Sequence, residues 1–251
     1  MRRFLLVTTV ATMLAPSVSM ADFKGWEGEL GLDYSMQRGN SYSNTLATRN
    51  RAERDTNNWR HLAKAEALNK ETRSSSSDSK ERIDERYFSS YKLDKKFGEA
   101  NYLFNQLSAE KDRFSGYNYQ ATYAFGYGRR IIDSPKHRLD IEAGPGFRVR
   151  ELEERPADWN PNKSRTEKDG IGLVAARYRW KISPSTRFEE DVSAEIEGGS
   201  SVTRSETSLT TKVNSRLALR LSHILRYNSK PSGDDVRKSD QETLIGLVWT
   251  L

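Results

Sequence analysis

The last twelve residues of the chain, Asp240 to Leu251, read DQETLIGLVWTL and decide its fold. From Thr243 onward every second side chain is apolar or nearly so, and this period of two is typical of a β-strand with one apolar face. A strand at a chain end leaves an unpaired edge unless another strand closes on it. The stretch therefore predicts a β protein whose final strand has a partner, as a closed barrel would provide.

Eleven further stretches alternate in the same way and are separated by turns or polar loops. With the last stretch they run over about 26–36, 43–54, 59–67, 82–93, 101–111, 117–128, 138–150, 170–182, 187–196, 203–213, 216–227 and 240–251. The even number places both chain ends on one side. We predict an all-β fold, a twelve-stranded antiparallel up-and-down transmembrane β-barrel. Apolar residues on both faces leave 101–111 without an orientation, and Gly144-Pro145-Gly146 is predicted to interrupt its strand.

The composition fits a membrane protein only if the protein is a barrel. The mean hydropathy is −0.82 and 30% of the residues are charged, and no apolar run of 18 or more residues predicts a membrane helix. A transmembrane barrel needs apolar side chains only at alternate positions, because its interior is polar. A soluble periplasmic β-barrel is the alternative. With no cysteine, the chain has no disulfide framework and no thiol chemistry.

The N-terminus has the pattern of a secretory signal peptide. Arg2 and Arg3 precede an apolar stretch over 4–14, and Ser19-Met20-Ala21 supplies small residues for cleavage after Ala21. A non-cleaved amphipathic N-terminus is the alternative. We therefore expect a signal peptide over 1–21 and one outer-membrane β-barrel domain over 22–251. This organisation predicts export to the bacterial outer membrane.

Two further patterns agree with a barrel whose ends are both periplasmic. The three longest predicted connections, 72–80, 153–168 and 229–239, follow odd-numbered strands, and outer-membrane barrels place long loops outside the cell. Aromatic side chains of the apolar face would then gather at the periplasmic interface, which favours amphipathic rings. The residues of this predicted belt are Trp26, Trp59, Tyr91, Tyr127, Trp180, Phe188 and Trp249. Because the last strand has to pair with the first, we also predict that Trp249 lies beside Trp26.

The opposite face of the strands carries charges of both signs, which a barrel would point into its lumen. The candidate lumen-lining residues are Arg49, Arg51, Lys64, Glu66, Arg86, Glu142, Arg148, Arg177, Asp191, Glu195, Arg220 and Arg226. One interpretation is an ion or solute pathway whose charged constriction sets selectivity. The other is an interior cross-linked by salt bridges and nearly closed, since long side chains can fill a barrel of this size. The sequence does not separate the two.

The three histidines form no recognised metal motif, and no cofactor or nucleophile motif is present, so we expect no metal and no cofactor. His223 is unusual because it would point toward lipid among leucines, where an ionisable group is costly. Strand pairing around Asn214-Ser215 would place Thr207 opposite His223 and Ser205 diagonal to it. An outer-membrane lipid hydrolase that uses an outward hydroxyl–imidazole pair is therefore an alternative function. A neutral interfacial histidine is the simpler interpretation.

Several short motifs resemble one protein family over essentially the whole mature chain. They are Trp26-x-Gly28, Arg38-Gly39-Asn40 with a Ser/Thr-rich strand, Tyr117–Tyr127 with Gly126-x-Gly128, Gly144-x-Gly146, and the run Tyr227…Pro231…Asp240. Together they resemble the YdiY-like family of salt-induced outer-membrane proteins. The resemblance implies an outer-membrane β-barrel of a Gram-negative bacterium. It implies no catalytic or ligand-binding residues.

We therefore expect an integral outer-membrane barrel rather than an enzyme, acting as a narrow pore or as a structural element of the envelope. A link to salt or osmotic stress is implied only by the family resemblance. The expected partners are outer-membrane lipid and lipopolysaccharide, the barrel-assembly machinery and, for a pore, ions or small solutes. Nucleic acid is not expected. Without the two leader arginines, 39 basic and 35 acidic side chains leave a net charge of +4 that is spread along the chain.

Overall fold

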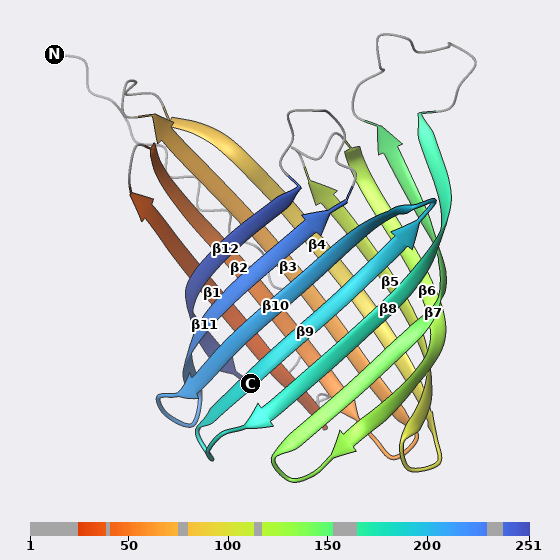
Figure 1. Cartoon of the computed structure of the whole chain (residues 1–251). Coiled ribbons are helices and arrows are strands. Elements are labelled where there is room, and N and C mark those ends of the chain that lie inside the picture. Colours follow the sequence, from red (N-terminus) through yellow and green to blue (C-terminus); the bar gives the residue numbers. More distant parts are fainter. Residues whose placement is uncertain (1–24, 39–40, 75–79, 113–116, 153–164, 230–237) are drawn as a thin grey trace, which may run out of the picture.

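Twelve strands form one closed antiparallel barrel in the computed structural model, which describes residues 25–38, 41–74, 80–112, 117–152, 165–229 and 238–251 (Figure 1). The strands are β1 (Trp26–Arg38), β2 (Ser41–Asp55), β3 (Trp59–Ser74), β4 (Lys80–Phe97), β5 (Asn101–Asp112), β6 (Tyr117–Asp133), β7 (His137–Leu152), β8 (Thr166–Lys181), β9 (Thr186–Glu197), β10 (Ser200–Lys212), β11 (Leu217–Asn228) and β12 (Ser239–Thr250). Each strand pairs with its neighbours in sequence, and β1 also pairs with β12. The described residues include no helix that could span a membrane. The predicted all-β, twelve-stranded antiparallel barrel is confirmed, whereas the predicted signal peptide lies outside the described residues.

The C-terminal stretch forms β12, the strand that closes the barrel. Its ladder with β1 runs from Glu29 opposite Thr250 to Tyr34 opposite Ile245. Its other edge pairs with β11 along nearly its whole length. Both edges of the last strand are therefore hydrogen-bonded, which removes the open edge that a terminal strand would otherwise present.

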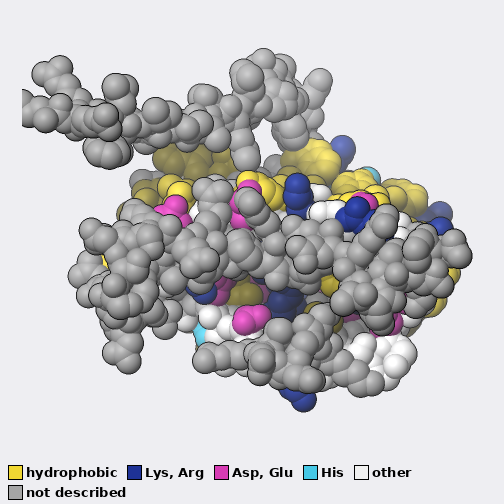
Figure 2. All heavy atoms as spheres, turned by 90° about the horizontal axis from the view of Figure 1, so that it is seen from above, with side chains coloured by type: hydrophobic (Ala, Val, Ile, Leu, Met, Phe, Trp, Pro, Cys, Tyr) yellow, Lys and Arg dark blue, Asp and Glu magenta, His cyan; other side chains and the backbone are white. Residues whose placement is uncertain are grey.

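Side chains of β12 alternate between the outer surface and the lumen. Ile245, Leu247 and Trp249 are about half exposed, whereas Leu244 and Val248 are buried inside. The same alternation on the other strands gives the barrel a broad apolar outer band, of the kind that contacts lipid in membrane barrels. Seen from above, hydrophobic side chains gather along one edge of the outline, and charged side chains of both signs are visible in its middle as well as at the edges (Figure 2).

The three longest connections all lie at one rim of the barrel. Because Glu29 near the start of β1 pairs with Thr250 at the end of β12, β1 begins and β12 ends at the same rim, which we call the terminus-side rim. It holds the turns 56–58, 98–100, 134–136, 182–185 and 213–216. The opposite, loop-side rim holds the three longest connections, 75–79, 153–165 and 229–238. The predicted pattern of connections is confirmed, although several strands are longer than predicted, and β8 already begins at Thr166.

The structure orients β5, which the sequence could not. Tyr102 and Phe104 point into the lumen and are buried with Ala124 and Leu173 in an apolar cluster. Leu103, between them in sequence, is half exposed on the outside. The strand is therefore apolar on both faces because part of the lumen is apolar as well.

The predicted interruption at Gly144-Pro145-Gly146 does not end the strand and is present only on its β6 edge, where no pair lies between Ala124 opposite Gly146 and Tyr127 opposite Ala143. β7 continues through this segment, and Pro145 lies opposite Gly172 in an unbroken ladder with β8. The glycines have a different role. A Cβ atom at Gly144 would lie 2.0 Å from the carbonyl oxygen of Phe125 on β6. The two strands approach so closely here that a side chain has no room.

Candidate functional site

Ion pairs cross the lumen between strands that are not neighbours in the sheet. Arg49 on β2 binds Glu206 on β10 at 2.6 Å, and Lys64 on β3 binds Asp191 on β9 at 3.2 Å. Because β2 and β10 are four places apart around the barrel, and β3 and β9 are six places apart, the paired side chains bridge the lumen as well as line it.

Two cavities meet at a ring of charged side chains within the lumen. The larger, of about 620 Å³, extends toward the loop-side rim, where Asn228 and Lys238 line it. The smaller, of about 60 Å³, reaches Glu29 and Arg51 in the half nearer the chain ends. Both cavities are lined by Lys64, Glu66, Asp191 and Glu206. With Arg204, which binds Glu66 at 3.1 Å, we call these residues the charged constriction.

Arg49 links the charged constriction to the seam between β1 and β12, because it binds both Glu206 and Asp33. Arg49 donates from Nε and Nη2 to the two carboxylate oxygens of Asp33 at 2.9 and 2.6 Å, and also to Ser222 at 2.9 Å. Asp33 is fully buried and lies opposite Gly246 of β12. A paired bond of this kind holds the Arg49 guanidinium in a fixed orientation. It therefore aims the remaining nitrogen, Nη1, across the lumen at Glu206.

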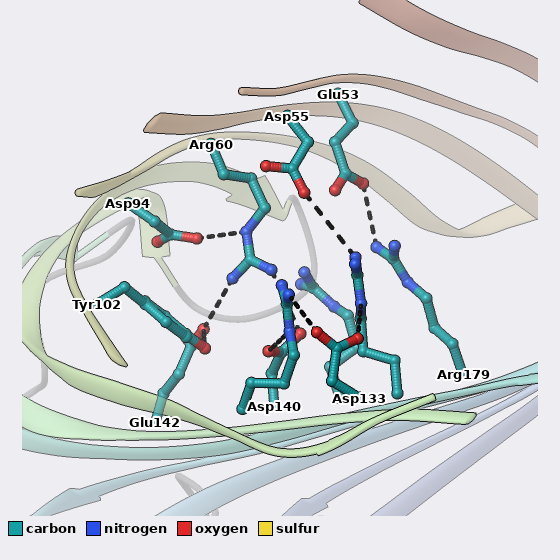
Figure 3. A network of polar contacts seen from close by, with 12 residues as sticks. Glu53, Asp55, Arg60, Asp94, Tyr102, Asp133, Asp140, Glu142 and Arg179 are labelled. Carbon is teal, nitrogen blue, oxygen red and sulfur yellow. Dashed lines mark hydrogen bonds and ion pairs between the residues drawn. The ribbon is translucent and has the colours of Figure 1, made fainter. Parts of the chain in front are cut away.

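A second cluster fills the lumen near the terminus-side rim on the β3–β7 side (Figure 3). Arg60 donates from Nε to Asp94 at 2.6 Å and from Nη1 to Asp140 at 3.3 Å. Arg130 also binds Asp140, at 3.2 Å. Arg60, Asp94 and Asp140 are at most 2% exposed. Charges buried to this degree persist only when paired, so the cluster forms a fixed floor in this part of the barrel.

The floor continues through Glu142 on β7. Its carboxylate accepts hydrogen bonds from Lys92 and, at 2.7 Å, from the hydroxyl group of Tyr102. The Tyr102 ring also lies beneath the Arg60 guanidinium, 4.9 Å from ring centroid to Cζ. This cation–π contact links the buried charges to the apolar cluster on β5.

Near the loop-side rim, ion pairs line the wall of the larger cavity. Arg148 binds Glu195 and, at 2.8 Å, Glu197. Arg150 binds Asp169 at 2.8 Å. These pairs join adjacent or nearby strands, so they leave the middle of the cavity open.

All twelve predicted lumen-lining residues lie on the inner face. Ion pairs engage Arg49, Arg51, Lys64, Glu66, Glu142, Arg148, Arg177, Asp191, Glu195, Arg220 and Arg226. Arg86 is half-buried and interacts electrostatically with Glu66 and Glu110. Other members of the network are absent from the predicted set, among them Asp33, Arg60, Lys92, Asp94, Asp140, Arg204 and Glu206. The alternation of side chains along each strand could have predicted these residues, because they share the inward-facing side of their strands with the predicted ones.

The predicted aromatic belt lies on the outer face at or near the terminus-side rim. Trp26, Trp59, Trp180, Phe188 and Trp249 are at or within two residues of a strand end. Tyr91 and Tyr127 lie deeper in β4 and β6, and the Tyr127 ring contacts Phe97 at the end of β4, with centroids 6.2 Å apart. Two histidines complete the belt. His61 lies between Trp26 and Tyr91, at 5.9 and 6.3 Å, and His137 stacks on Trp180 at 5.7 Å.

The prediction that Trp249 lies beside Trp26 is wrong. Trp249 lies opposite Leu30, four residues along β1 from Trp26, a separation of about 13 Å along a strand. Leu251 occupies the intervening position instead. Its N–H donates to the Gly28 carbonyl at 3.0 Å, and its side chain covers the space where Gly28 has no Cβ. The register of the closing strand, which the sequence does not specify, causes the difference.

His223 forms no pair with Ser205 or Thr207, the hydroxyl-bearing residues expected as its partners. Thr207 lies opposite His223, as predicted. Ser205, however, donates to Glu190 at 2.6 Å, and Thr207 also donates to Glu190. His223 Nδ1 contacts the hydroxyl of Thr243 at 3.1 Å. A base has to touch the hydroxyl that it activates, so the contacts of His223 do not support a hydrolase that uses Ser205 or Thr207 as its nucleophile. Within the described ranges, no three His, Asp or Glu side chains are grouped to hold a metal ion.

Residues 28–251 match the model of a protein family named DUF481, described as a protein of unknown function. The chain belongs to this family. The barrel and its charged lumen are therefore features of a member of the DUF481 family. The uncharacterized protein YdiY of Escherichia coli (strain K12) is 26% identical to it over 229 residues, which cover 91% of this chain and 84% of the relative. The predicted relationship to the YdiY-like family is confirmed.

The fold of the DUF481 chain is similar to that of solved outer-membrane barrels. The NanC porin superposes with a TM-score of 0.53 at 11% identity, covering 89% of this chain and all of the porin. The COG4313 outer membrane channel from Pseudomonas putida F1 superposes with a TM-score of 0.50 at 9% identity, covering 90% of this chain and 94% of the channel. At such low identity the likeness shows the fold alone.

Proposed function

We propose that this protein resides in the outer membrane of a Gram-negative bacterium and forms a narrow pore for water, small ions and small solutes. Its fold and its exposed apolar band support the location, and short turns at the rim where β1 begins and β12 ends support a periplasmic position of that rim. The expected surroundings are lipid and lipopolysaccharide, with assembly by the barrel-assembly machinery. The proposal includes the link to salt or osmotic stress that the family resemblance implies. It is supported by the ion pairs of the lumen, because salt weakens such pairs.

The observation that carries the proposal is the meeting of two cavities at the charged constriction. A purely structural barrel has no need for a cavity of about 620 Å³ that opens onto the constriction. The bridging pairs narrow the passage, because each holds two long side chains across the lumen. Water and small ions can pass between such pairs, whereas larger solutes would have to break them.

The lining of the smaller cavity is nearly balanced in charge. Its acidic side chains are Glu29, Glu66, Glu189, Asp191 and Glu206, and its basic side chains are Arg49, Arg51, Lys64 and Arg220. A ring of one sign would favour counter-ions. A balanced and mutually paired lining instead gives weak selectivity between cations and anions.

Planar-bilayer recording tests the proposal. The wild-type barrel should show a small conductance with cation and anion permeabilities of similar size. Removing both ends of one constriction pair, Glu66→Ala with Arg204→Ala, should raise the conductance several-fold without leaving an unpaired buried charge.

The matched control is Arg150→Ala with Asp169→Ala, a pair away from the constriction of which Arg150 lines the larger cavity, and it should leave the conductance near the wild-type value. Heat-modifiable gel mobility would verify that each variant is folded. If wild type and constriction variant were both silent, the pore would be ruled out and a structural barrel would remain. A wild-type conductance as large as that of an open porin would rule out the constriction.

A further inference from the structure

A row of polar side chains crosses the outer surface of the barrel on β9–β12. Along the ladders, Glu190 lies opposite Thr207, Thr207 opposite His223, and His223 opposite Thr243. Ser205 lies beside the row and donates to Glu190. We call these five residues the outer polar row. Each lies well inside its strand, so the row belongs to the barrel wall and not to a turn or loop.

The outer surface next to this row is apolar, and β10 departs from it. Leu219 and Leu221 precede His223 on the outer face of β11, and Ile245 and Leu247 follow Thr243 on β12. The outward side chains of β10 are instead mostly hydroxyl-bearing: Ser201, Thr203, Ser205, Thr207, Leu209 and Thr211. Polar and ionisable groups that face hydrocarbon are costly. Contact with another protein surface would remove this cost.

Hydrogen bonds within the outer polar row leave capacity for a partner. The Glu190 carboxylate accepts one bond on each oxygen from Ser205 and Thr207. An ionised carboxylate offers about four acceptor positions, so further donors can bind. His223 uses Nδ1 with Thr243, and Nε2 has no hydrogen-bond partner among the residues described. An acceptor and an imidazole nitrogen are thus available on either side of β10.

We propose that the outer polar row is the interface with a second copy of this chain, related by a two-fold axis along the membrane normal. A two-fold interface is isologous, so an axis in front of β10 sets β9 of one copy against β11 of the other. Glu190 of each copy then meets His223 of the other. With strands about 4.8 Å apart and tilted by about 40°, the two side chains differ in height by about 6 Å, which Glu and His can span together.

Small side chains at the centre favour this occupant. Ser205 and Thr207 on β10 would let the two barrel walls approach closely, as small residues do where membrane segments pack. The outer polar row is also self-complementary, since the Glu190 carboxylate and the His223 imidazole lie on opposite sides of β10. The interface does not depend on the pore, because a closed barrel would pair through the same surface.

Cysteine cross-linking tests the contact directly, because the chain has no cysteine of its own. Thr207→Cys, close to the axis, should form a disulfide-linked homodimer in oxidised outer membranes, visible on a non-reducing gel. Leu107→Cys on the outer face of β5 is the control and should remain monomeric. Ser205→Cys repeats the test if Thr207→Cys does not fold.

Two differently tagged chains test the two-fold arrangement. Co-expressed Glu190→Cys and His223→Cys chains should cross-link with each other more strongly than either does with itself. A folded Thr207→Cys barrel that stays monomeric would overturn the proposal, as would a cross-link only to a protein of another mass. An equally strong homodimer from Leu107→Cys would show random collision and overturn it too.

Discussion

Gly246 shows how a single missing side chain permits the barrel to close. It lies on β12 opposite Asp33, and a Cβ atom there would lie 2.1 Å from the Asp33 carboxylate and 2.9 Å from the Leu32 carbonyl oxygen. Asp33 cannot move aside freely, because both of its oxygens accept hydrogen bonds from Arg49. The glycine therefore makes room for the charge that orients Arg49 toward the constriction.

We expect Gly246→Ala to destabilise the barrel by about 1–3 kcal/mol, the usual cost of forcing an extra atom into a packed site. The measurement is the midpoint temperature at which the folded band is lost in heat-modifiable gel mobility. Gly172→Ala is the control, because nothing lies within 4 Å of a Cβ atom at that position. Equal midpoints for the two variants would contradict the role of Gly246.

At the scale of the element, β5 shows that the two faces of one strand have different surroundings. Phe104 is 1% exposed within the lumen, whereas Leu103 is 49% exposed on the outer surface. The sequence shows two apolar faces, and only the surrounding strands reveal which one meets protein. Lys92 on β4 lies over the Phe104 ring, 5.4 Å from its centroid, so the inner face joins the apolar cluster to the buried charges.

Phe104→Ala should therefore cost about 3–5 kcal/mol of stability, since it removes a ring from a closely packed interior. Leu103→Ala, one residue away on the lipid-facing side, should cost clearly less, because lipid can fill the space. Urea unfolding of the refolded barrel in detergent or lipid would compare the two variants. A larger loss for Leu103→Ala would show that the orientation of β5 is the reverse.

At the scale of the whole molecule, opposite walls are joined by ion pairs that remain partly open to water. The side chains of Lys64 and Asp191 are 23% and 27% exposed, and those of Arg204 and Glu66 are 24% and 12% exposed. Salt screens charges of this kind more effectively than fully buried ones. The floor around Arg60 should persist in salt, while the charged constriction loosens.

Conductance should therefore rise with salt more steeply than the conductivity of the solution. Between 0.1 and 1 M salt the Debye length falls from about 10 Å to about 3 Å, which is comparable with the 3.1–3.2 Å between the paired charges of the constriction. The measurement is the ratio of single-channel conductance to bulk conductivity across a KCl series. In the Glu66→Ala, Arg204→Ala variant this ratio should change less. A constant ratio in the wild type would exclude a salt-loosened constriction.

The sequence by itself determined the twelve strands, the common rim at which β1 begins and β12 ends, the rim of the three longest connections, and the inner position of charged residues such as Arg49 and Asp191. These features follow from the alternation of successive side chains between the two faces of a strand, which is a local property of an extended chain. Only the tertiary structure decided the register that sets Trp249 against Leu30, the inner face of β5 and the partner of each charge. Arg49 and Glu206 are 157 residues apart in the chain and meet because the barrel closes. No local pattern can encode that distance, because it depends on the position of every strand between them.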